Sequence, residues 1–486
     1  MMADRASRLN LSRQSLRCLL LASAALAGLG APLVLGLGAA GAQDGPNPSL
    51  VLSFGSRLSV DDNRGLDPVS AGTTSSFDTR LGLVYLSETT TSSLRLAAGT
   101  VLRFSEGPDS TANGFDDPRL ALNYTRSGAD SLLSFNVSQV ESQVAFFDPL
   151  TLIGDGEGEA PPPPIDPGDL VTGGTGSRTD RSIALRFETG LGRPLGLSVQ
   201  ASRRERDFSG TTDPDQFDTT TDNLTLGARF RISDRTEANL TLSRNDFSAE
   251  DVELTERQTD RISLGIDHAL RPDLSLRFSL GQSRVRVEET IGMVRGSRTT
   301  TGLNGSLALT RDLVNGMIGL VLGRDISIDG ARTDLTLNRS LDLPSGTLAL
   351  SFGASQGEGD DATWIGTLNY TQDLPRGQIS ATLDRRVGLS DADAATATTR
   401  ARLGWSQDLT VRGGLDLSVD YLDVDSDTAG DDRSRARLSM AYTWDLTEDW
   451  QLAGGYTRTQ SRTESSGSAA SNMLFLSLDR DFTFAP

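Results

Sequence analysis

Residues 182–202 read SIALRFETGLGRPLGLSVQAS, and this stretch decides the fold class. Apolar Ile183, Leu185 and Phe187 alternate with mostly polar neighbours, and the pattern resumes after the turn-forming residues 192–194. Successive side chains of a β-strand point to opposite faces, so each half of the stretch has one apolar and one polar face. The stretch therefore predicts two antiparallel strands joined by a tight turn.

The same unit recurs along most of the chain. Further short turns are expected at residues 233–235, 271–273, 342–344, 373–375, 408–410 and 445–447. These turns follow one another about every 30 to 40 residues, one for each hairpin. Longer polar connections separate them, at residues 209–221, 248–257, 424–433 and 460–471. Short turns that alternate with long loops are typical of outer-membrane barrels, with the turns on the periplasmic side.

We therefore predict an all-β fold, a transmembrane antiparallel up-and-down β-barrel of about 22 strands, within a range of roughly 18 to 24. Its short turns are expected in the periplasm and its long loops outside the cell. After the first 42 residues no apolar run approaches the roughly 18 residues of a membrane helix, which excludes a helical membrane protein. A soluble sandwich or propeller also has many strands, but it does not require long loops at alternate connections.

Residues 1–42 have the layout of a cleaved signal peptide. Four arginines open it: Arg5, Arg8, Arg13 and Arg17. A stretch rich in Leu, Ala and Gly follows and ends in the small residues Ala40-Gly41-Ala42, so we place cleavage after Ala42. An uncleaved anchor is the alternative, which Pro32 and the many small residues disfavour. Cleavage removes Cys18, the single cysteine, and leaves residues 43–486 as one barrel domain without disulfides.

Charge bears on the partners of the chain. The formal net charge is −19, and all 46 basic residues are arginines. Because nucleic-acid phosphates repel a chain this acidic, nucleic acid is excluded as a partner.

One segment interrupts the regular pattern. Residues 148–178 include four consecutive prolines, 161–164, in a Gly-rich acidic surround that can form neither a strand nor a helix. By alternation the segment falls at the outer end, so we expect an extracellular loop. The alternative is an inward fold that narrows the pore.

The C-terminal stretch carries a family resemblance. Leu474, Leu476 and Leu478 alternate with other residues, and the chain closes through Phe482 and Phe484. This resembles the C-terminal signal strand of porin-like outer-membrane β-barrel proteins of Gram-negative bacteria. The resemblance implies recognition by the barrel-assembly machinery through Phe482 and Phe484, and a location in the outer membrane, in contact with its lipid and lipopolysaccharide. Two departures from the pattern are Arg480 within the apolar row and Ala485-Pro486 after the last Phe.

Aromatic residues cluster beside the expected periplasmic turns. They are Trp405, Tyr442, Trp444, Trp450, Phe482 and Phe484. Such a cluster indicates the aromatic girdle of a membrane barrel, although aromatic residues favour strands in any case.

The chain offers little for catalysis or metal binding. The single histidine, His268, continues an outward apolar row, so we assign no catalytic residue and expect no enzyme. Residues 423–427 read DVDSD and resemble half a calcium loop, but Thr428 stands where the loop needs Gly. We interpret this run as a solvated acidic tip, or as a loose bridge through divalent cations to lipopolysaccharide. No metal site and no cofactor are expected.

Arginines on the polar rows are the candidate pore residues. They are Arg186, Arg229, Arg231, Arg277, Arg402, Arg435 and Arg437. Charges that face lipid are costly, so these side chains are expected to line a wet interior beside Glu188, Asp267, Asp416, Asp420 and Asp479. Two interpretations remain open: the opposite charges pair only to satisfy each other, or the arginines form a constriction that favours anionic solutes.

The sequence thus predicts a porin-like outer-membrane channel for passive or loosely selective passage of small hydrophilic solutes. The alternatives are an accessory barrel that exports an exopolysaccharide or binds an envelope or export partner, and a structural barrel without transport.

Export predicts a defined N-terminus. The protein purified from the outer membrane should begin at Gln43, because the signal peptidase cleaves after small residues such as Ala42. Mass spectrometry of the intact chain measures this directly, and a mature chain that retains Cys18 would contradict it.

Overall fold

The computed structural model describes residues 49–108, 113–152, 176–211, 213, 216–291, 294–389, 395–426, 432–464 and 467–484. These residues belong to one compact unit, Pro46–Pro486. The predicted signal peptide lies outside them, as do residues 427 and 428 of the acidic run and the four prolines at 161–164. Among the described residues, no helix is both long enough and apolar enough to span a membrane.

The described part of the chain forms 22 strands and two 3₁₀ turns. They are β1 (Ser49–Asp61), β2 (Thr74–Glu88), β3 (Ser92–Glu106), β4 (Asn113–Ser127), β5 (Ser131–Gln143), η1 (Val144–Phe146), η2 (Pro149–Leu152), β6 (Ser177–Thr189), β7 (Leu195–Ser209), β8 (Thr219–Ser233), β9 (Thr236–Ala249), β10 (Glu256–Arg271), β11 (Leu274–Ile291), β12 (Val294–Leu313), β13 (Gly316–Ser327), β14 (Gly330–Leu343), β15 (Gly346–Gln356), β16 (Thr363–Leu374), β17 (Gly377–Leu389), β18 (Ala395–Asp408), β19 (Gly413–Ser426), β20 (Arg433–Asp445), β21 (Trp450–Thr463) and β22 (Gly467–Phe484). The predicted strand number is confirmed.

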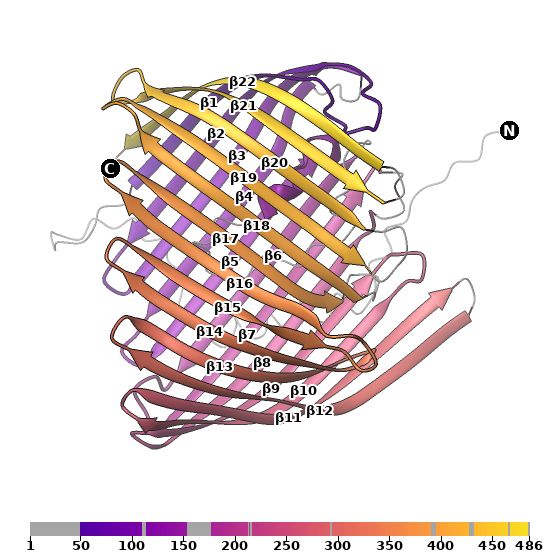
Figure 1. Cartoon of the computed structure of the whole chain (residues 1–486), viewed down its shortest axis with the longest axis vertical. Helices are drawn as coiled ribbons and strands as arrows, with labels where there is room; N and C mark the ends of the chain where they lie inside the picture. Colours follow the sequence, from indigo (N-terminus) through magenta and orange to yellow (C-terminus); the bar gives the residue numbers. More distant parts are fainter. Residues whose placement is uncertain are drawn as a thin grey trace, which may run out of the picture. The chain divides into compact units, whose positions relative to one another are not determined.

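Each strand pairs antiparallel with the strand before and after it, and the first and last strands pair with each other. The closing register runs from Leu50 opposite Phe484 to Asp61 opposite Met473. Figure 1 shows indigo β1 beside the yellow C-terminal strands. Closure pairs the backbone groups of both edge strands, which a barrel surrounded by lipid requires. The predicted up-and-down barrel is therefore confirmed.

The wall has an apolar outer face. Alternate side chains such as Leu264, Leu280 and Leu320 leave between 48% and 57% of their surface exposed. In a soluble protein so much exposed Leu, Ile and Phe is unusual, whereas a membrane barrel buries this face in lipid. The other face of the same strands carries the polar residues and surrounds the lumen.

The connections at the two ends of the barrel differ, as the sequence predicts. At one end, the short-turn end, strands such as β8 and β9 are joined directly by Asp234 and Arg235. At the other end, the loop end, several connections are longer, but two are not: only two residues separate β11 from β12 and β13 from β14. There the strands themselves extend, β12 to 20 residues, and Val285 and Val287 pack on Ile326 and Ile328. The predicted alternation of short turns with long loops therefore has two exceptions at this part of the rim.

Aromatic side chains gather at the short-turn end. Trp450 stands edge to face against Phe54, with ring centroids 6.4 Å apart. The guanidinium of Arg480 lies 4.2 Å from the centroid of Phe482 and 5.2 Å from that of Trp450, and it pairs with Asp449 at 3.0 Å. Arg480 therefore interrupts the apolar row without leaving an unpaired charge toward lipid.

The fold generates a test of orientation. Four exposed valines can each be replaced by Cys: Val69 and Val252 in loop-end connections, and Val314 and Val411 in short turns. On intact cells an impermeant maleimide should label Val69→Cys and Val252→Cys but not Val314→Cys or Val411→Cys, because short turns face the periplasm. All four should react after permeabilisation. The inverse pattern would reverse the orientation, and equal labelling of all four on intact cells would contradict a membrane-spanning wall.

Candidate functional site in the lumen

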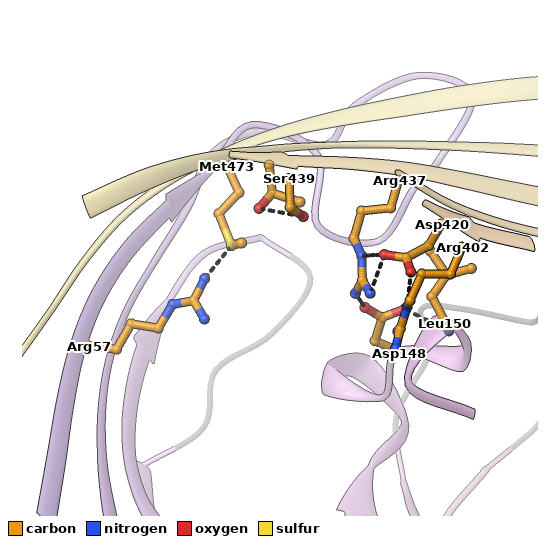
Figure 2. A network of polar contacts seen from close by, with 9 residues as sticks. Arg57, Asp148, Leu150, Arg402, Asp420, Arg437, Ser439 and Met473 are labelled. Carbon is orange, nitrogen blue, oxygen red and sulfur yellow. Dashed lines mark hydrogen bonds and ion pairs between the residues drawn. The ribbon is translucent and has the colours of Figure 1, made fainter. Parts of the chain in front are cut away.

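A short segment between β5 and β6 enters the lumen. We name residues Val144–Leu152 the lumen strap; it contains η1 and η2. Leu150 has no exposed surface, its backbone N–H donates to Asp148 Oδ1 at 3.0 Å, and η2 contacts β19. Figure 2 shows Asp148 and Leu150 facing side chains of the barrel wall. Residues 148–152 therefore follow the alternative interpretation of this segment, an inward fold, and not the surface loop. Residues 177–178 belong to β6, and residues 153–175 lie outside the described residues.

One buried carboxylate joins the strap to the wall. Asp420 is 1% exposed and accepts from Arg402 Nε at 2.6 Å and from Arg437 Nη2 at 2.9 Å. Arg437 Nη1 also donates to Asp148 of the strap. The three wall residues form one row, because Arg402 and Arg437 stand opposite Asp420 in the register of β18, β19 and β20. We name these four residues the shared-carboxylate cluster (Figure 2).

The strap also covers apolar residues on the lumen side of β19. Leu422 and Val424 have no exposed surface, although they continue the inward row that begins with Asp416 and Asp420. A lumen row that turns from acidic to apolar indicates that another segment covers it. Leu422 and Val424 thus favour the inward fold already in the sequence. The acidic run that begins at Asp423 hides this pattern, because it resembles a solvated loop tip.

A second attachment lies at Phe146, two residues before Asp148 in the strap. The ring of Phe146 has the guanidinium of Arg64 at 3.9 Å and that of Arg103 at 3.8 Å from its centroid. Arg103 also pairs with three carboxylates, those of Asp78 at 3.1 Å, Asp116 at 3.2 Å and Asp117 at 2.8 Å. The strap thus reaches from β5, past the wall of β3, to β19 and β20, and both attachments use arginine.

The seven predicted pore arginines all belong to lumen rows, but the structure brings only Arg402, Arg435 and Arg437 together, on β18 and β20. Most of the others pair locally: Arg186 with Glu188 at 2.6 Å, Arg277 with Asp267 at 2.5 Å, and Arg229 with Glu237 at 3.8 Å. Arg231 is exposed at the short-turn end of β8 and forms no ion pair with any described residue. Arg435 is 3% exposed beside the strap. Their role in ion selectivity stays a prediction.

The remaining residues considered from the sequence are the histidine, the acidic run and the two C-terminal phenylalanines. His268 lies opposite Thr236 near a short turn, and its Nδ1 is 2.9 Å from the hydroxyl oxygen of Thr236. Asp425, in the predicted acidic tip, pairs with Arg385 at 3.1 Å. Within the described residues, no group of three or more His, Cys, Asp or Glu side chains could hold a metal ion. Phe482 and Phe484 pair with Leu52 and Leu50 where the barrel closes.

The shared-carboxylate cluster should contribute to stability. Asp420→Asn removes the charge that two guanidiniums share in a buried site, so we expect the free energy of unfolding to fall by about 3 kcal/mol. The matched control is Asp267→Asn, whose partner Arg277 is 71% exposed, and it should cost less than about 1 kcal/mol. Urea unfolding of the barrel in lipid vesicles measures both. If both variants lost the same free energy of unfolding, the ion pairs of Asp420 would contribute no more than an exposed ion pair does.

Comparison with known proteins places the fold. No protein-family model matches the chain, and no curated protein matches it in sequence. The open form of the ferric-catecholate import receptor Fiu from E. coli K12 has a TM-score of 0.54 at 11% identity, covering 91% of this chain and 82% of the receptor. The FrpB iron transporter of Neisseria meningitidis (F3-3 variant) has a TM-score of 0.54 at 9% identity, covering 90% and 81%. Together with the closed wall and its apolar outer face, this fold makes the chain an outer-membrane β-barrel protein.

Proposed function

We propose that the barrel is a porin-like channel through which small hydrophilic solutes cross the outer membrane, and that the lumen strap narrows the passage. The observation that carries the proposal is the strap itself, attached to the wall through Asp148 and, two residues earlier, through Phe146. A polar lumen narrowed by an inward segment suits selective diffusion, because the charges that line a constriction decide which solutes pass.

Phe482 and Phe484 belong to the same proposal. Their position in the closing strand supports a role as the signal that the barrel-assembly machinery reads. We also propose that the exposed outer rows contact outer-membrane lipid and that the loop end contacts lipopolysaccharide.

A gated importer is the second candidate. The number of strands supports it, because outer-membrane transporters with 22 strands have a plugged lumen. The two similar structures are named as an import receptor and a transporter, for a ferric catecholate and for iron. The distinction from an open channel is electrical: a channel passes steady current in a bare bilayer, whereas a plugged importer does not.

Replacing the strap should enlarge the pore. Gln143 and Ser177 are register partners at the ends of β5 and β6, so an Asn-Gly turn can replace residues 144–176 without disturbing the wall. In planar bilayers the intact protein should pass steady single-channel current, and the strap replacement should pass a larger current through the same wall.

The control replaces an exposed connection, residues 357–362 between β15 and β16, by the same Asn-Gly turn, and its conductance should equal that of the intact protein. An unchanged conductance after strap replacement would contradict a constriction by the strap. Absence of current from the folded intact protein would favour the gated importer, an export barrel that needs its partner, or a structural barrel.

A further inference from the structure

A cavity of about 500 Å³ lies between the strap and the wall formed by β1, β2, β3 and β20 to β22. Six arginines and three aspartates line it, together with Phe146, Phe147, Met473 and Phe475. This volume is in the usual range for pockets that bind small molecules. The lining combines an excess of positive charge with an apolar and aromatic surface.

The carboxylates of the cavity already have partners. Asp78 accepts from Arg103 at 3.1 Å, Asp148 accepts from Arg437, and Asp61 accepts from Ser471 and from the backbone N–H of Asn63. In the register, Asp78 stands opposite Arg57 on β1, yet its carboxylate accepts from Arg103 on β3. Asp78 and Asp148 are therefore each paired with an arginine, whereas Asp61 accepts from neutral donors and acts electrostatically on Arg64. Three aspartates do not balance the six arginines of the lining.

Three of the lining arginines, which we name the open arginines, form no ion pair with any described residue: Arg57 on β1, Arg64 in the β1–β2 connection and Arg80 on β2. The guanidinium of Arg57 lies 4.0 Å from the ring centroid of Phe475. Its one hydrogen-bond partner among the described residues is the sulfur of Met473, at 4.0 Å (Figure 2). Arg80 stands opposite Gly55, two residues from Arg57 on the same lumen row. Such diagonal positions are about 7 to 8 Å apart, close enough for two guanidiniums to reach one anion.

Arg64, in the β1–β2 connection, contributes the third positive charge and contacts Phe146 of the strap. One face of its guanidinium lies on Phe146, and its Nε is buried without a hydrogen-bond acceptor. Burial lowers the pKa of Arg64 to about 10, while nearby Asp61 raises it and Arg103 lowers it. The group therefore keeps its charge at neutral pH, and a buried Nε–H without an acceptor is costly unless a ligand supplies one.

We propose that this cavity binds a small organic anion whose phosphate or carboxylate group meets the open arginines and whose apolar or aromatic body lies against Met473 and the edges of the Phe146 and Phe475 rings. Guanidinium groups bind such oxyanions through paired N–H donors, and aromatic rings favour a flat apolar body beside them. The inference extends the proposed function by naming the class of solute that the narrow part of the lumen retains.

The test is equilibrium binding to the full processed barrel in detergent, by isothermal titration calorimetry with phenyl phosphate and, separately, with benzoate. Each anion should bind once per barrel. Arg64→Gln should weaken binding roughly tenfold, and Arg57→Gln/Arg80→Gln by roughly tenfold for each guanidinium removed. Arg64 lies in the connection between β1 and β2, so we expect the Arg64→Gln variant to fold. Its anion affinity therefore tests the proposal even if the double variant fails to fold.

The matched control is Arg277→Gln, which removes one guanidinium from the lumen wall at β11, far from the cavity in strand order. It should leave the affinity unchanged. Equal weakening by Arg277→Gln, equal binding of neutral benzyl alcohol, or no saturable binding of either anion would overturn the proposal. If inorganic phosphate bound as tightly as phenyl phosphate, the proposal that the cavity also recognises an organic body would be wrong. Binding is measured without a current, so failure of the anion site is distinguished from failure of the channel.

Discussion

The pairing of β1 with β22 is the contact on which the rest of the structure depends. A strand at the edge of an open sheet would present unpaired N–H and C=O groups to lipid, where no water can satisfy them. The closing register, from Leu50 opposite Phe484 to Asp61 opposite Met473, removes both edges. Closure also decides what each side chain can do, because one row of every strand then faces lipid and the other faces an enclosed lumen.

Charge inside that lumen is organised by pairing. Asp420 holds two wall arginines, and one of them, Arg437, reaches Asp148 of the strap. Removing one member of a buried set leaves another charge uncompensated, so the cluster stabilises the inward position of the strap. Where the strap passes β1 and β2 the balance between positive and negative side chains changes. Six arginines and three aspartates line the cavity there, and Asp78 and Asp61 already accept from Arg103 and Ser471.

Much of the wall could be predicted from the sequence, because period-2 alternation reports directly which side chain faces lipid. Residues 182–202 alone identify two strands and their turn, and the pattern predicts the number of strands found among the described residues. The strap could not be predicted in the same way, since its 3₁₀ turns have no such period and its contacts are distant in sequence. Leu422 and Val424 carried a weak signal. The pairing of arginines with acidic residues was one of the two interpretations that the sequence left open. The sequence could not show that Arg402 and Arg437 share one carboxylate, because only the register places Asp420 between them.

The position of the strap in the lumen is the central claim, and a cross-link between strap and wall tests it most directly. In the Asp148→Cys/Arg437→Cys variant, a short bifunctional thiol reagent applied to the folded barrel should join the two positions, because their native side chains are in contact. Mass spectrometry of the digested protein should then recover a strap peptide bound to a β20 peptide. The pair Asp148→Cys/Arg186→Cys, which replaces an arginine on β6 that pairs with Glu188, should give no such product. Absence of the first cross-link, while each thiol reacts singly in the folded barrel, would contradict the inward strap.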